Sequence, residues 1–189
     1  MQVRVLAVAG LLSLAGVSGL TAQDGPRAVA TVRGDGISGT IQFEEIDVQQ
    51  GTRDAGLTVG LKGVRVTVDV TGLPPGPHGF HLHAVGQCEP TFGAAGGHFD
   101  PGPHGMTDPD ANHPFHMGDL PNLVAAANGR ATLTATTTRV TLSPGPVSLF
   151  DEDGSAVIIH GNPDQGTTGA SGSGLSGGPR IACGVITRR

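Results

Sequence analysis

The sequence of 189 residues contains no tryptophan and no tyrosine, and positive charge is in short supply. Eleven lysines and arginines face 16 acidic residues, for a formal net charge of -5. A nucleic-acid partner requires a basic surface, so this balance argues against one. The scarcity of charge and of large aromatics, together with 32 glycines and 14 prolines, favours an all-β protein with many turns over a helical one. The length suits a single domain, and no internal repeat is present.

Charged residues are also nearly absent from the N-terminus. Arg4 alone precedes an apolar run over residues 5–20, which small residues follow up to Ala22. This pattern is typical of a secretory signal peptide, predicted at residues 1–22, with a mature domain at 23–189. An uncleaved membrane anchor is the alternative, disfavoured by the short length and the Gly and Ser content. The sequence therefore predicts a periplasmic or extracellular protein without membrane attachment after cleavage.

Cysteine occurs only twice, at Cys88 and Cys183. An oxidising compartment permits a disulfide, and these residues are its only candidate pair. The bond would close a loop of about 95 residues, which contributes on the order of 4–5 kcal/mol in the chain-entropy description. Two free buried thiols are the alternative.

Alternating apolar residues predict about eight short strands. The clearest is 64–70, where four valines share one face. The apolar run 156–159, which ends at His160, suits a strand buried on both faces. Other strands are expected at 27–33, 37–43, 81–83, 123–127, 131–138 (continuing through 140–143) and 180–186. Residues 44–56 and 72–79 read as turns, Asn128-Gly129 predicts a hairpin, and 161–179 is either a functional Ω-type loop or a flexible linker.

All eight histidines lie between His78 and His160, and seven of them fall within residues 78–119. His81 and His83 are two apart, so on a strand both imidazoles project from one face while Phe80 and Leu82 point to the other. The histidines that follow lie in a Gly- and Pro-rich segment that can fold around an ion. We interpret this stretch as a metal site.

An ordered set of motifs makes the interpretation specific. It consists of H-x-H, a nearby cysteine, G-G-H-F-D-P, a further His-Gly, H-x-G-D-L-P-N, a strand ending in His, and G-G-x-R-x-A-C-G-V-I. In this order the motifs resemble copper/zinc superoxide dismutases of the secreted bacterial kind over roughly residues 28–187. The resemblance implies an eight-stranded Greek-key β-barrel or sandwich with two long functional loops.

The resemblance also implies two metal sites that share one ligand. The copper ligands would be His81, His83, His98 and His160; the zinc ligands would be His98, His104, His116 and Asp119. Imidazoles suit Cu(II), and a mixed His/carboxylate set suits Zn(II). The spacing from His104 to His116 is longer than the family's usual one, which makes His113 a rival to His104. His78 is interpreted as a hydrogen-bonding residue rather than a ligand.

Three further positions match the family. Asp164 would link ligands of the two sites and fix imidazole orientation. Arg180 would attract a small anion to the copper. Cys88 and Cys183 match the family disulfide.

The implied activity is dismutation of superoxide to oxygen and hydrogen peroxide by a redox-cycling copper beside a structural zinc, with His98 taking and returning a proton. A non-catalytic copper-binding or copper-delivery protein on the same fold is an alternative, as is a copper-only dismutase with a degraded zinc site. A cupin-type enzyme is a third, but it requires a carboxylate soon after H-x-H, and the first acidic residue after His83 is Glu89. A homodimer is a candidate assembly.

Overall fold

The computed structural model describes residues 25–49, 60–102, 116–167, 170 and 173–189. The predicted signal peptide and both His104 and His113 lie outside these residues. The described chain forms nine strands and one short 3-10 helix: β1 (Arg27–Gly34), β2 (Ser38–Gln49), β3 (Gly60–Thr71), β4 (Gly76–His78), β5 (Phe80–His83), η1 (Phe92–Ala95), β6 (Leu123–Ala125), β7 (Ala131–Thr137), β8 (Ala156–His160) and β9 (Arg180–Arg188). None of the described segments is a helix that could span a membrane.

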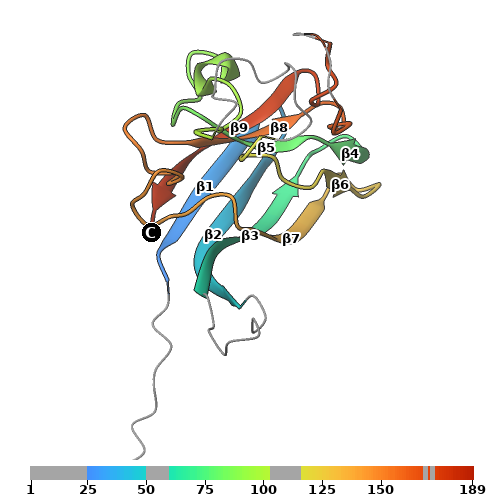
Figure 1. Cartoon of the computed structure of the whole chain (residues 1–189). Helices are drawn as coiled ribbons and strands as arrows, with labels where there is room; N and C mark the ends of the chain where they lie inside the picture. The colour runs from blue at the N-terminus through green and yellow to red at the C-terminus, as the bar shows by residue number, and fades with distance from the viewer. Residues whose placement is uncertain (1–24, 50–59, 103–115, 168–169, 171–172) are drawn as a thin grey trace, which may run out of the picture.

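Seven strands form one antiparallel sheet in the order β5-β8-β9-β1-β2-β3-β7, and β4 pairs with β6 in a separate two-stranded ribbon. The sheet curls around a core, as Figure 1 shows. After the β1-β2-β3 meander the chain crosses to β5, returns to place β7 beside β3, and crosses again to place β8 between β5 and β9. These crossings are Greek-key connections. The all-β prediction is confirmed.

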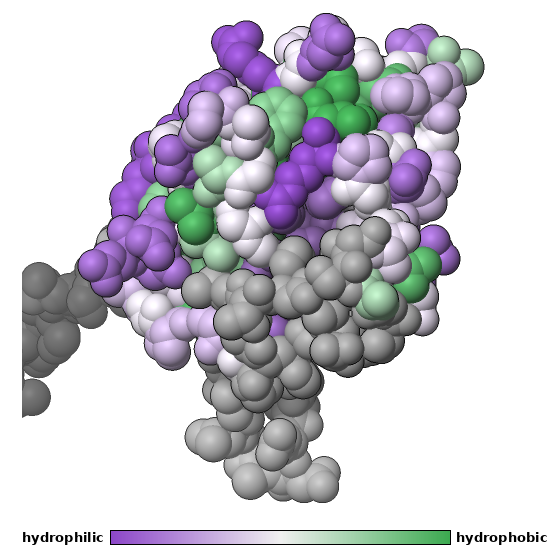
Figure 2. All heavy atoms as spheres, turned by 90° about the horizontal axis from the view of Figure 1, so that it is seen from above, coloured by the Kyte–Doolittle hydropathy of each residue, from purple (hydrophilic) through white to green (hydrophobic). Residues whose placement is uncertain are grey.

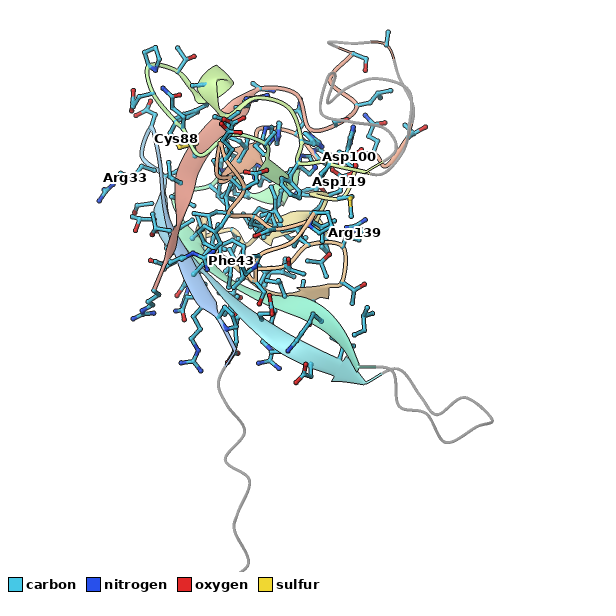
Figure 3. The ribbon with its side chains drawn as sticks, turned by 60° about the vertical axis from the view of Figure 1, so that its left-hand side comes forward. Arg33, Phe43, Cys88, Asp100, Asp119 and Arg139 are labelled. Carbon is cyan, nitrogen blue, oxygen red and sulfur yellow. A yellow bond between two sulfur atoms is a disulfide. The ribbon has the colours of Figure 1, made fainter. Side chains whose placement is uncertain are left out.

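The core follows the period-2 pattern of the strands. Val64, Val66, Val68 and Val70 are all at most 2% exposed, as their shared face predicts. Phe43 from β2 packs in the same interior (Figure 3). Burying each such side chain contributes roughly 1.5–3 kcal/mol, so this sheet provides a rigid base for the loops above it.

Strand β8 is buried on both faces, as predicted. Val157 and Ile159 face the main core, while Ile158 packs in a second cluster with Cys183 and, at its edge, Phe92 of η1. The disulfide between Cys88 and Cys183 is present, with an S–S distance of 2.02 Å. The loop that the disulfide ties down therefore covers the second face of β8.

Several predicted boundaries were wrong. Residues 44–49 continue β2 rather than turning, because Glu44 pairs across the sheet with Arg27 and Arg65 at 3.0 and 2.7 Å. Within 72–79 the short strand β4 forms.

The predicted turn at Asn128-Gly129 exists and is closed by a hydrogen bond from Ala126 N to Arg130 O at 2.9 Å, while the strands on either side pair elsewhere, β6 with β4 and β7 with β3. Residues 140–143 are not a strand. The carboxylate of the buried Glu45 accepts hydrogen bonds from Leu142 N and from both N and Oγ of Ser143, at 2.6–2.7 Å, which holds this segment against the barrel.

The face seen from above in Figure 2 carries small hydrophobic patches among hydrophilic residues. Among the described residues only two large hydrophobic side chains are exposed: Val124, with an exposed fraction of 67%, and Val185, with 37%. Exposed apolar surface on the described residues is therefore limited to small, scattered patches.

Candidate metal centre

Two neighbouring strands present three histidines on one face. In β5, Phe80 and Leu82 point into the core, so His81 and His83 project to the opposite side, as predicted. Strand β8 pairs with β5 and ends at His160, whose ring lies 4.8 Å from that of His81 between centroids. Alternation along paired strands thus collects these imidazoles from sequence positions far apart.

A fourth histidine joins from the loop after η1. His98 forms an isolated β-bridge with His83, and its ring centroid lies 4.0 Å from that of His81. One ring nitrogen from each of His81, His83, His98 and His160 lies within 4.8 Å of the others, and all four residues are buried. These are the four residues predicted to bind copper.

Three of these rings have a buried nitrogen with no hydrogen-bond partner: Nδ1 of His81 and Nε2 of both His83 and His160. Leaving a buried polar atom unpaired costs about 1–3 kcal/mol. Three such atoms converging on one point are explained if they are ligands of an ion.

The opposite ring nitrogens fix the tautomers. His83 Nδ1 lies 3.0 Å from Gly96 O, and His160 Nδ1 lies 3.0 Å from Gly178 O. A carbonyl only accepts, so these Nδ1 atoms carry the protons and each Nε2 keeps a lone pair. His81 donates from Nε2 to Asp164 Oδ2 at 2.7 Å, which leaves the lone pair on Nδ1. The three unpartnered nitrogens are therefore the atoms with free lone pairs, and the residues fit a copper ion.

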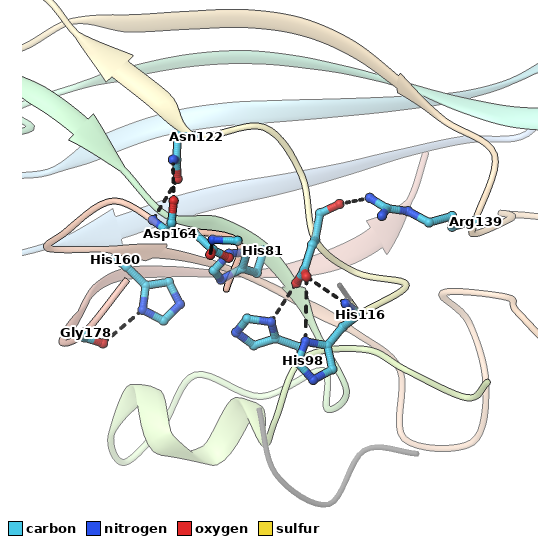
Figure 4. Close-up of polar contacts among 10 residues, drawn as sticks. His81, His98, His116, Asn122, Arg139, His160, Asp164 and Gly178 are labelled. Carbon is cyan, nitrogen blue, oxygen red and sulfur yellow. Dashed lines mark hydrogen bonds and ion pairs between the residues drawn. The ribbon is translucent and has the colours of Figure 1, made fainter. Parts of the chain in front are cut away.

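A second group lies on the other side of His98 and consists of His98, His116 and Asp119 (Figure 4). His98 Nδ1 donates to Asp119 Oδ1 at 2.7 Å, and the backbone N–H of His116 donates to Asp119 Oδ2 at 2.7 Å. Two imidazoles and a carboxylate form a donor set that suits zinc. His98 belongs to both groups, so one imidazole joins the two sites.

Burial and mutual proximity favour the neutral form of His83, His98 and His160. Burial, followed by the neighbouring His81, lowers the pKa of His98 to about 4 and that of His160 to about 3. The pKa of His83 lies well below its ordinary value for the same reason, with His98 as the nearby charge. Burial alone would raise the pKa of Asp119, but its contacts with His116 and His98 hold that pKa well below the usual range. At neutral pH His83, His98 and His160 are therefore neutral and Asp119 is ionised, the forms that bind metals.

Arg180 lies at the start of β9, where it donates from Nη1 to Phe92 O at 2.7 Å and from Nη2 to Gly96 O at 2.6 Å. The same Gly96 oxygen accepts from His83 Nδ1. The Arg180 guanidinium and the His83 ring therefore share one carbonyl as acceptor. This shared contact places a fixed positive charge next to the four-histidine group.

The remaining predicted residues fall into three cases. Asp164 contacts His81, as described. His78 is buried outside both groups, with its ring nitrogens 2.7 and 2.8 Å from the carbonyls of Pro74 and His160. His104 and His113 lie outside the described residues, so the choice between them stays a prediction.

Two residues of the centre were missed from the sequence. Asn122 donates a hydrogen bond to the backbone oxygen of Asp164 (Figure 4). Arg139 donates one to the backbone oxygen of Asp119 (Figures 3 and 4). Asn122 stands in the H-x-G-D-L-P-N motif, which could have marked it. Nothing in the sequence around Arg139 indicates its position.

The curled all-β sheet and the paired histidine groups together define a metalloprotein with two adjoining metal sites. Residues 37–186 match the family described as Copper/zinc superoxide dismutase (SODC). A Cu-Zn superoxide dismutase of Caulobacter vibrioides is 41% identical over 143 residues, covering 71% of this chain and 79% of that protein. One of Deinococcus radiodurans is 40% identical over 135 residues, covering 66% and 70%. Among solved structures, a SOD-like protein from Bacillus subtilis is 30% identical with a TM-score of 0.62, covering 83% of this chain and 96% of that one. The chain belongs to the copper/zinc superoxide dismutase family.

Proposed function

We propose that this protein dismutates superoxide, oxidising one superoxide to oxygen and reducing a second, with two protons, to hydrogen peroxide. The observation that carries the proposal is the convergence of three buried lone-pair nitrogens on one point beside a histidine shared with a second group. The family match gives that arrangement its reaction. Delivery of copper without turnover finds no specific support among the described residues.

We assign copper to His81, His83, His98 and His160, and zinc to His98, His116 and Asp119. A histidine of the 103–115 segment would complete the zinc set, with His104 favoured over His113. Copper supplies the one-electron redox chemistry, and zinc polarises the shared imidazole.

The chain's own groups do the rest. Asp164, Gly96 and Gly178 hold the proton on the outer nitrogen of His81, His83 and His160, so that these rings keep one tautomer. Arg180 attracts the anionic substrate, since a fixed guanidinium raises the local concentration of anions and the rate of encounter. His98 Nε2 takes a proton and gives it to the forming peroxide, because its ring is the one that both groups share.

The first test is metal content and the rate of superoxide decay, measured on the protein loaded with both metals and on a His81→Ala variant. One copper and one zinc per chain, with rapid decay that the variant loses, would support the proposal. Copper with activity but without zinc would mean that the zinc set is incomplete. Copper without measurable activity would refute dismutation and favour a binding or delivery role.

We also propose that the protein is exported. The sequence of residues 1–22 and the disulfide both suit an oxidising compartment outside the cytoplasm. N-terminal sequencing of the mature protein should begin near Gln23, and detection of residue 1 in it would contradict cleavage. Light scattering tests the candidate homodimer, which would give twice the chain mass.

A further inference from the structure

One side chain holds the backbone of Asp164 at two points. Asn122, in the segment between Asp119 and β6, donates from Nδ2 to Asp164 O at 2.8 Å and accepts from Asp164 N at Oδ1 at 2.9 Å. Both hydrogen bonds are partly buried and join residues 42 positions apart. Asn122 therefore satisfies the donor and the acceptor of one peptide position at once, which fixes that position more firmly than a single bond would.

The carboxylate on this fixed backbone reaches a buried histidine. Asp164 Oδ2 accepts from His81 Nε2 at 2.7 Å, and its Oδ1 accepts from the backbone N–H of Gly166 at 2.7 Å. The side chain of His81 is 0% exposed, and its other nitrogen, Nδ1, faces the four-histidine group. Asn122 thus holds the backbone of Asp164, whose side chain in turn holds the Nε2–H of His81 (Figure 4).

We propose that Asn122 is a positioning residue for copper, which sets the direction of the His81 lone pair through Asp164. The proposal rests on the function proposed above. Residues that orient metal ligands fix ring angle and tautomer, and their removal weakens metal binding. The competing explanation is that Asn122 only fastens the 161–179 loop, in which case its loss would lower stability and leave the metal site unchanged.

Replacing Asn122 removes both hydrogen bonds to the backbone of Asp164, and no neighbouring side chain takes its place. Asn122 and Asp164 border a cavity of about 290 Å³, whose wall also includes Asp119 and Arg139. In Asn122→Ala, water entering this cavity can satisfy the backbone of Asp164 but does not fix its position. The carboxylate then samples several positions, and His81 with it. We expect copper affinity to fall about tenfold, the lower end of the range for groups that orient metal ligands.

The experiment compares Asn122→Ala with Asn128→Ala in the full chain. Asn128 is a matched control because its Oδ1 also accepts a backbone N–H, that of Arg130, but in an exposed turn away from both metal groups. Copper affinity is measured by competition with a chelator, the copper environment by the electron paramagnetic resonance spectrum of Cu(II), and stability by thermal unfolding of metal-free protein. The Asn122 variant should lose copper affinity and change the spectrum, whereas the control should do neither.

A double-mutant cycle with Asp164→Ala identifies the path. If Asn122 acts through Asp164, removing Asn122 in the Asp164→Ala background should change copper affinity less than about twofold, since coupled residues are not additive. Additive losses, or an Asn122→Ala variant with unchanged affinity and spectrum and a lowered melting temperature, would overturn the proposal. Failure of the dismutase function would show instead in the wild type, as absent copper or absent activity.

Discussion

The backbone at Gly177 packs directly against the side chain of His160 and limits where that ring can lie. A Cβ added at Gly177 would lie 2.7 Å from His160 Cβ and 2.8 Å from its Cγ, where ordinary contacts begin at 3.4 Å. His160 would therefore have to shift by about 0.7 Å, the difference between 3.4 and 2.7 Å. The shift would also strain the hydrogen bond from His160 Nδ1 to Gly178 O. Because misplacement of a reacting group by 1 Å costs roughly a hundredfold, Gly177→Ala should lower superoxide turnover by about ten- to a hundredfold and weaken copper binding.

The control must carry the backbone strain without the collision. Gly177 has a φ of 103°, so alanine there costs about 1–3 kcal/mol of conformational strain. Gly174 has a φ of 77°, and an added Cβ would meet only Gly178 Cα at 3.7 Å. Gly174→Ala should therefore lose stability but keep copper affinity, measured by chelator competition, and turnover. Equal turnover and copper affinity in the two variants would refute the claim that the backbone at Gly177 positions His160.

Three further predictions follow from the charged and titratable groups. Metal-free protein should become less stable to urea as the pH falls from about 6.5 towards 4. Burial lowers the pKa of His98 to about 4 and that of His160 to about 3, so in this range the unfolded chain binds protons that the folded chain does not. A stability that does not change with pH would contradict this. Glu45→Ala should cost about 3 kcal/mol of unfolding free energy, because the buried donors that its carboxylate satisfies lose their acceptor, and a loss below about 1 kcal/mol would mean that water replaces the carboxylate. Arg180→Ala should slow superoxide decay at least about tenfold and flatten its dependence on salt, while the exposed Arg33→Ala should leave both unchanged.

Much of the metal centre was predictable because its signals are local. The spacing of His81 and His83 puts both rings on one face of a strand, and the apolar run before His160 indicates a strand buried on both faces. Which histidines meet in space came from the family resemblance, since residue spacing does not encode strand order. The structure brings His98 and His160 to the H-x-H pair through β-bridges and strand pairing.

The failed predictions involve partners that only the folded chain supplies. Charges at Glu44 and Asp47 suggested a turn, yet both belong to β2, where they pair with Arg65 and Lys62 on the neighbouring strand. The apolar alternation at 140–143 suggested a strand, but Glu45 binds this segment's backbone from 98 positions away. Long-range polar contacts of this kind leave no periodicity in the sequence, so pattern-based reasoning misses them.

The scattered origin of the four-histidine group has a consequence for how the protein folds and unfolds. The hydrogen bond between His81 and Asp164 joins residues 83 positions apart, and the disulfide spans 95. The four histidines meet only after β5 has paired with β8, and that pairing is itself long-range, so loop closure opposes it and the group forms late. Metal ions should therefore bind a nearly native chain and have little influence on the rate at which it reaches that state. Their effect should appear almost wholly as slower unfolding, so that metal loading sets the lifetime of the folded protein.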